Sequence, residues 1–110
     1  MCSSDLKEIK SILESAKKSI EDKNRFYDLI EKAILKSLSF KFSITIESFN
    51  KEKIKDITSN KGLSNDDILL IIQLIENCEK AKYSRSSNMI MNNDLSSTRK
   101  IVDIILSHNK

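Results

Sequence analysis

The sequence predicts an all-α fold, a small bundle of four to five helices around a central apolar helix at about residues 65–83. Apolar residues recur every three or four positions along several separate segments, which is the spacing of one helix face. The 110-residue chain has one glycine and no proline, so it offers few of the tight turns that hairpins need. Only one segment alternates like a strand, and a strand without a partner leaves its backbone groups unpaired.

The first predicted helix runs from about residue 5 to residue 21. Ser3 or Ser4 can cap its start, and Asp5 suits the positive end of a helix dipole. One face carries the apolar side chains that predict burial: Leu6, Ile9, Ile12, Leu13, Ala16 and Ile20.

The second predicted helix begins near Asp22 or Asn24 and runs to about Phe42. Its apolar face holds Phe26, Leu29, Ile30, Ala33, Ile34 and Leu38. Residues 40–46 alternate between apolar and polar side chains, which is the pattern of a strand. We therefore expect an extended segment to about Ser48, and a short β-like stretch within it is compatible with the pattern.

A short third helix is predicted at about residues 50–59, capped by Asn50 or Ser48. Ile54 and Ile57 would face inward. Gly62 is the only glycine, and it stands where a left-handed helix stop is expected.

The fourth predicted helix follows Ser64, with Asp67 three residues later as an acidic variant of the capping box. It is apolar over more than one face, so we place it at the centre of the bundle. The side chains that make it apolar are Ile68, Leu69, Ile71, Ile72, Leu74, Ile75 and Cys78.

A polar loop from Tyr83 to Asn88 separates this helix from the last one. The last helix should begin between Asn88 and Asp94 and run to about Ser107. Its inner face carries Leu95, Thr98, Ile101, Val102 and Ile105. Residues 1–110 then form a single helical domain, a size that supports one modest core.

The charge balance gives little support to nucleic-acid binding. The chain has 19 basic and 16 acidic side chains, for a net charge of +3. Most of the basic side chains are lysines, which lack the forked guanidinium that suits bidentate phosphate contacts. We expect no nucleic-acid partner, and a small basic helical nucleic-acid-associated protein is the alternative function.

No residue pattern predicts catalysis or a cofactor. One glycine cannot build a phosphate-binding loop, and the two cysteines with one histidine cannot complete a usual four-ligand zinc site. His108 has no partner nearby in sequence, and Asp66 and Asp67 suit a helix start. Cys78 shares a helix face with apolar residues, which favours a buried thiol over a reactive one. We therefore predict no catalytic residues, no metal, no cofactor and no enzyme.

The end of the fourth helix is the most specific segment of the chain. Glu79 could pair with Arg85 or with a lysine. Tyr83 either closes the core at the helix end or, with Lys82 and Arg85, borders a docking surface.

Several segments together resemble one family. DKNRFY at residues 22–27 leads into EKAI at 31–34, LSFKFSI at 38–44 and FNKEKI at 49–54. NCEKAKYS follows at 77–84, and its Cys-Glu-x-Ala-(Arg/Lys)-Tyr motif is the best marker. Their order and spacing resemble the C-terminal cytoplasmic region of the BatD aerotolerance protein family of Bacteroidetes-type bacteria. Arg85 stands where that family often has proline.

The resemblance implies a longer parent protein with an extracytoplasmic β-rich part, one membrane span and this helical tail. It implies protein partners: von Willebrand-type and tetratricopeptide Bat proteins and a MoxR-type AAA+ ATPase. No segment here reaches the ~18 apolar residues that span a bilayer, so we expect this chain to be soluble. The resemblance implies a place at the cytoplasmic side of the inner membrane.

The expected function is a non-catalytic helical protein–protein interaction module. Its candidate interaction residues are Phe26, Tyr27, Glu79, Lys82, Tyr83 and Arg85.

Overall fold

The computed structural model describes residues 3–42, 50–83 and 91–107, and for residues 3–6 and 82–83 it describes the backbone alone. Every regular element in these ranges is a helix, so the predicted all-α fold is confirmed. The helices are α1 (Ser3–Lys18), α2 (Lys23–Phe42), α3 (Lys51–Asn60), α4 (Asn65–Tyr83) and α5 (Met91–Ser107). The predicted extended segment to Ser48 and the loop after Tyr83 lie outside the described residues.

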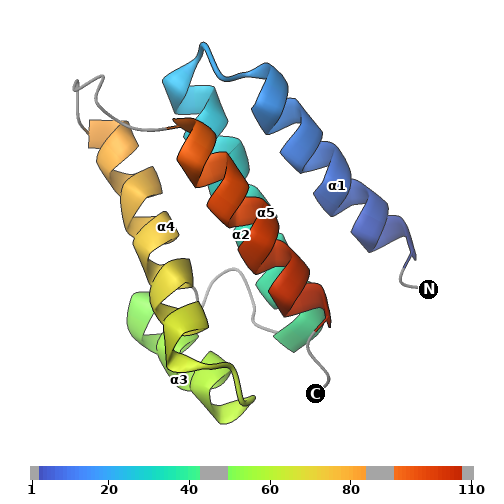
Figure 1. Ribbon diagram of the computed structural model, residues 1–110, viewed down its shortest axis with the longest axis vertical. Helices are drawn as coiled ribbons and strands as arrows, with labels where there is room; N and C mark the ends of the chain where they lie inside the picture. Colours follow the sequence, from blue (N-terminus) through green and yellow to red (C-terminus); the bar gives the residue numbers. More distant parts are fainter. Residues whose placement is uncertain (1–2, 43–49, 84–90, 108–110) are drawn as a thin grey trace.

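Four helices form the body of the bundle (Figure 1). α1 and α4 run in one direction, whereas α2 and α5 run in the other, and α3 lies at one end beside α4. α2 packs against α1, α4 and α5, while α4 packs against α2, α3 and α5. α2 has the most extensive packing in the bundle, and the apolar helix α4 packs against three of the other helices.

Local signals set most helix boundaries. The first helix ends at Lys18, earlier than the predicted residue 21, because Asp22 caps the next helix. The Asp22 carboxylate accepts a hydrogen bond from the Arg25 amide at 3.3 Å, and the Asp22 carbonyl accepts one from the Phe26 amide at 2.8 Å. Of the two caps that the sequence allowed, the structure uses Asp22.

Specific residues cap both ends of α3 and the start of α4. The Asn50 side chain accepts a hydrogen bond from the Lys53 amide at 2.8 Å, as predicted for the cap of α3. Gly62 has φ of 94°, and its amide donates to the Ser59 carbonyl at 3.1 Å. The Leu63 amide donates to the Thr58 carbonyl at 3.1 Å, which completes a Schellman motif. Ser64 then caps α4 through its hydroxyl, which accepts from the Asp67 amide at 3.2 Å.

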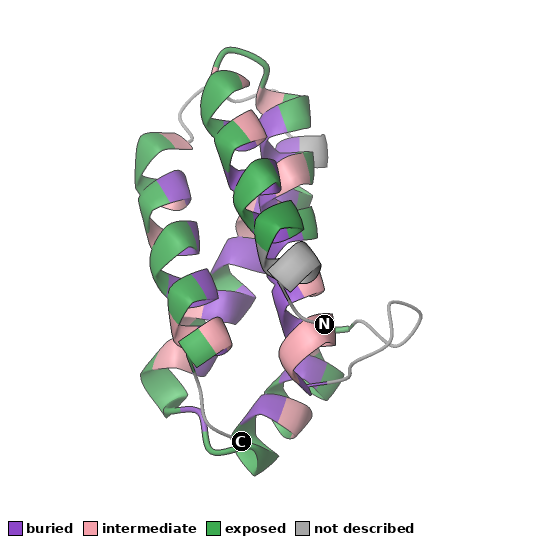
Figure 2. Cartoon of the chain, turned by 90° about the vertical axis from the view of Figure 1, so that its right-hand side faces the viewer, coloured by how far each residue is buried: buried purple, intermediate pink, exposed green. Residues whose placement is uncertain are grey.

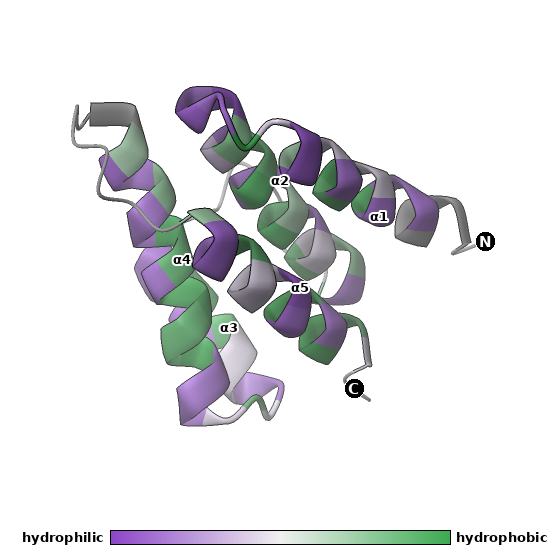
Figure 3. Ribbon diagram, turned by 45° about the horizontal axis from the view of Figure 1, so that its top comes forward, coloured by the Kyte–Doolittle hydropathy of each residue, from purple (hydrophilic) through white to green (hydrophobic). Residues whose placement is uncertain are grey.

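The core collects the inner faces of all five helices (Figure 2). The predicted inner face of α5 is entirely buried, and Cys78 on α4 is fully buried, as predicted. Leu69 departs from the prediction, since 51% of it is exposed. α4 has neighbours on most of its sides but not all, and Leu69 lies on an uncovered side. Figure 3 shows the apolar residues concentrated on the facing sides of the helices.

Candidate functional site

A polar cluster joins three helices within the bundle. The Tyr27 hydroxyl on α2 donates a hydrogen bond of 2.5 Å to one carboxylate oxygen of Asp94 in the first turn of α5. The other oxygen accepts from the Asn77 side-chain amide on α4 at 3.2 Å. Gln73 donates in turn to the Asn77 carbonyl oxygen at 3.2 Å. Both oxygens of the carboxylate thus have donors from different helices, which fixes how these helices pack.

The environment of Tyr27 keeps its hydroxyl protonated. Burial raises the pKa of Tyr27 strongly, and the hydrogen bond to Asp94 and the negative charge of that carboxylate raise this pKa further. The Phe26 ring packs edge-on against the Tyr27 ring, with ring centroids 4.9 Å apart and planes at 88°. The phenol therefore acts here as a hydrogen-bond donor that joins α2 to α5, not as a proton-transfer group.

Two of the candidate interaction residues lie in the core. Phe26 is fully buried and Tyr27 is only 1% exposed, so neither side chain is part of an exposed docking surface. This corrects the prediction, and the reason is that α2 has neighbours on three sides and buries a wide face. Tyr27 lies three residues before Ile30 and seven before Ile34, so helical spacing alone could have placed it in the core.

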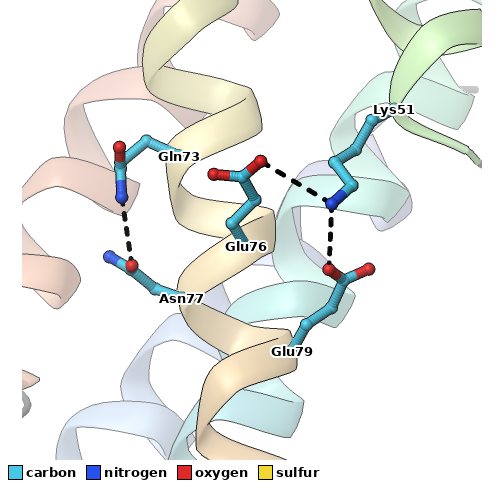
Figure 4. A network of polar contacts seen from close by, with 5 residues as sticks. All are labelled: Lys51, Gln73, Glu76, Asn77 and Glu79. Atoms are coloured by element: carbon cyan, nitrogen blue, oxygen red, sulfur yellow. Dashed lines mark hydrogen bonds and ion pairs between the residues drawn. The ribbon is translucent and has the colours of Figure 1, made fainter.

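Glu79 is exposed and takes part in an ion-pair cluster between α3 and α4 (Figure 4). Lys51 Nζ lies 3.1 Å from Glu79 and 3.6 Å from Glu76. Of the two partners that the sequence allowed for Glu79, the structure shows a lysine. The hydrogen bond to Glu79 raises the pKa of Lys51, and the charges of both carboxylates add to the increase. Lys51 therefore stays protonated, and its ion pairs lie between the start of α3 and the second half of α4.

The remaining candidates are only partly placed. Lys82 and Tyr83 are the last two residues of α4, and only their backbone is described. Arg85 lies outside the described residues. The structure therefore brings Phe26 and Tyr27 together in the core and Glu79 to the surface near α3.

Among the grooves on the surface of the described part of the chain, two lie between pairs of helices. One, of about 420 Å³, lies between α1 and α5, with Ile9, Leu13 and Val102 among its lining residues. The other, of about 700 Å³, lies along α3 and the start of α4 and is lined mostly by polar and charged residues. Sequence analysis missed both, because a groove depends on how far apart two helices pack and no single-helix pattern encodes that distance.

Asp66 and Asp67 lie in the first turn of α4, as predicted for a helix start. Across residues 3–42, 50–83 and 91–107, no three side chains of histidine, cysteine, aspartate or glutamate gather as they would to hold a metal ion. His108 lies outside these ranges. None of the helices within them is long and apolar enough to cross a membrane.

Comparisons with protein-family models, with curated proteins and with solved structures found no match to this chain. The resemblance to the BatD family therefore stays a prediction based on the segments quoted above. The fold and the contacts described here come from the residues of this chain alone.

Proposed function

We propose that this chain is a non-catalytic helical protein–protein interaction module that resembles the cytoplasmic tail of the BatD aerotolerance family. In this proposal it follows a membrane span in a longer protein and acts at the cytoplasmic side of the bacterial inner membrane. Its partners are other Bat proteins and a MoxR-type AAA+ ATPase, as the family resemblance implies. The proposal rests on one observation: the buried polar groups of the described residues are hydrogen-bonded within the bundle.

The buried serine and threonine hydroxyl groups each bond within their own helix. Ser37 and Thr58 donate to carbonyl oxygens one turn earlier, at 2.8 and 2.6 Å, and Thr98 does the same at 2.7 Å. Tyr27 and Asp94 bond to each other across two helices. Within the described residues, every buried side-chain nitrogen or oxygen has a hydrogen-bond partner. These polar groups specify the packing of the bundle, which supports a scaffold that meets other molecules through its outer surface.

Some of the charged side chains on the outer surface form ion pairs between helices. Lys36 pairs with Glu8 at 3.2 Å and Arg99 pairs with Glu14 at 3.6 Å, and these contacts tie α1 to α2 and α5. Such exposed pairs contribute little to stability. Exposed charged side chains in a defined arrangement instead suit the selection of a partner and the steering of its approach.

The direct test is binding of the purified chain to the MoxR-type ATPase and to the other Bat proteins of the same genome. We expect binding by the wild-type chain and by Ser96→Ala, an exposed control on α5. We expect weaker binding by a double variant with Lys82→Ala and Tyr83→Ala. Circular dichroism must show that each variant is folded.

Two results would contradict the proposal. One is loss of binding only in variants that unfold, because this would mean that no dedicated surface exists. The other is binding to random DNA that falls steeply as salt rises, which would favour the nucleic-acid alternative instead.

A further inference from the structure

We propose that the groove between α1 and α5 binds an acidic amphipathic helical segment of a partner protein. This inference rests on the proposed interaction function, and it adds a second surface to the one at the end of α4 and states what chemistry the partner brings there.

The groove exists because α1 and α5 both pack mainly against α2 and make few contacts with each other. The two helices run side by side in opposite directions (Figures 1 and 3). The space left between them measures about 420 Å³. Its lining residues recur at helical spacing, at positions 9, 10 and 13 on α1 and at 99, 100, 102, 103 and 106 on α5. Each wall is therefore one face of a helix, which is the form of a groove that receives a third helix.

The floor of the groove is apolar. Ile9, Leu13 and Val102 are buried there, and Leu106 is only partly buried and packs against the core. An occupant with apolar side chains on one face would cover Leu106 and extend the core. The lined stretch from Arg99 to Leu106 rises by roughly 10 Å, or about two helical turns. A segment of two to three turns with apolar residues three and four positions apart fits this length.

The rim of the groove is cationic. Lys10, Arg99 and Lys100 border it, against the single carboxylate of Asp103. Arg99 already pairs with Glu14 at 3.6 Å. Lys10 and Lys100 are exposed, and none of the ion pairs formed among the described residues includes either of them. Opposite charge on the occupant would complement these two lysines and set its orientation.

The other grooves lack this preference. The groove along α3 is lined by Lys53 and Lys55, which are balanced by Glu52 and Asp56. A groove of about 330 Å³ along α2 has Lys32 and Lys36 against Asp28 and Glu31. A balanced rim does not select the charge of a partner. A peptide suits the groove between α1 and α5 better than a nucleic acid does, because the floor is apolar and the arginine that lines it, Arg99, already pairs with Glu14.

The test uses a synthetic, fluorescein-labelled helical peptide of about four turns, with leucines three and four positions apart and glutamate on both flanks. Its control keeps the leucines and replaces glutamate by lysine. Fluorescence anisotropy at low salt measures the Kd for the wild-type chain and for two double variants. Lys10→Glu with Lys100→Glu changes the groove, and Lys53→Glu with Lys55→Glu makes the same charge change on α3.

We expect the wild-type chain and the α3 variant to bind the acidic peptide with equal affinity. The groove variant should bind about tenfold more weakly, since two attractive contacts become repulsive. The neutral variant Lys10→Gln with Lys100→Gln should fall between them, and circular dichroism should show every variant folded. The lysine-flanked peptide should bind at least tenfold more weakly than the acidic one.

Three results would overturn the inference. They are no binding of the acidic peptide, equal binding of both peptides, or equal weakening in the groove and α3 variants. The proposed function can survive each of them, because it is tested with the partner proteins. If those partners bind the wild-type chain and the groove variant equally, the groove fails and the interaction module remains.

Discussion

The two sides of α5 have different roles. The side that faces α2 and α4 carries Asp94 and Thr98, whose polar groups are hydrogen-bonded, and Ile101, which is fully buried. The side that faces α1 carries Lys100 and Leu106 along an open groove. One helix thus holds the bundle together on one side and offers a surface on the other. The comparison shows that helical periodicity identifies the buried side but leaves the use of the other side open.

The largest expected effect is on the inner side. Ile101→Ala should lower the free energy of unfolding by about 2–5 kcal/mol, because it leaves a cavity where the helices meet. Lys100→Ala, on the opposite side, is the matched control and should change it by no more than about 0.5 kcal/mol. Urea unfolding followed by circular dichroism gives both values. Similar losses in the two variants would remove the contrast between the sides.

The polar cluster gives the next effect. Tyr27→Phe keeps the ring but removes the donor to Asp94, and it should cost about 1–3 kcal/mol. Ser96→Ala on α5 is a control that touches no part of the cluster. Chemical unfolding at neutral pH measures the difference. No loss in Tyr27→Phe would mean that this hydrogen bond adds nothing beyond ring packing.

The same cluster predicts a dependence on alkaline pH. The pKa of Tyr27 is raised in the folded state, whereas an unfolded tyrosine ionises near pH 10. Below pH 10 both states hold the proton, and the stabilising contact is fully present. Above pH 10 the unfolded state loses the proton first, so stability falls by up to about 1.4 kcal/mol per pH unit. Tyr27→Phe should lack this part of the slope in unfolding measured from pH 9 to pH 11, and identical slopes would contradict the account.

Cys78 tests the packing of α4 with a smaller change. Its thiol is fully buried, so thiol reagents should label it slowly in the native state and quickly in urea. A Cys2→Ser background leaves this thiol as the only one. Cys78→Ala should cost on the order of 1–2 kcal/mol through lost packing. Fast labelling of the native chain would instead indicate a reactive, accessible cysteine.

The smallest effect is expected at the ion pairs of Lys51. Its side chain and those of Glu76 and Glu79 are exposed by 39–48%, so water and salt screen their attraction. Lys51→Met should leave Tm nearly unchanged, and any difference should vanish in high salt. A large, salt-independent loss would show that this cluster fixes α3 more firmly than its exposure suggests.

Features that depend on neighbouring residues in the chain were predictable from the sequence. Asn50, Gly62 and Ser64 act within a few residues of their own positions, so their roles at helix ends follow from local chemistry. The inner face of α5 followed from periodicity in the same way. These signals sufficed for the fold class and for most helix boundaries.

Features that join distant residues were not predictable. Tyr27 and Asp94 are 67 positions apart, and nothing local marks them as partners. The exposure of Leu69 depends on which sides of α4 have neighbours, and the groove depends on the spacing of α1 and α5. Phe26 and Tyr27 are a different case, because helical spacing already put Phe26 on the apolar face of α2 and could have put Tyr27 in the core as well.

The contrast between the two sides of α5 can be read directly from methyl NMR spectra during titration with the acidic peptide. The account predicts that the signals of Val102 and Leu106 shift as the peptide binds, while those of Ile101 and Ile105 stay in place. Shifts confined to Ile68, which lines the groove along α3 and the start of α4, or shifts at Ile101 and Ile105 alone, would contradict it.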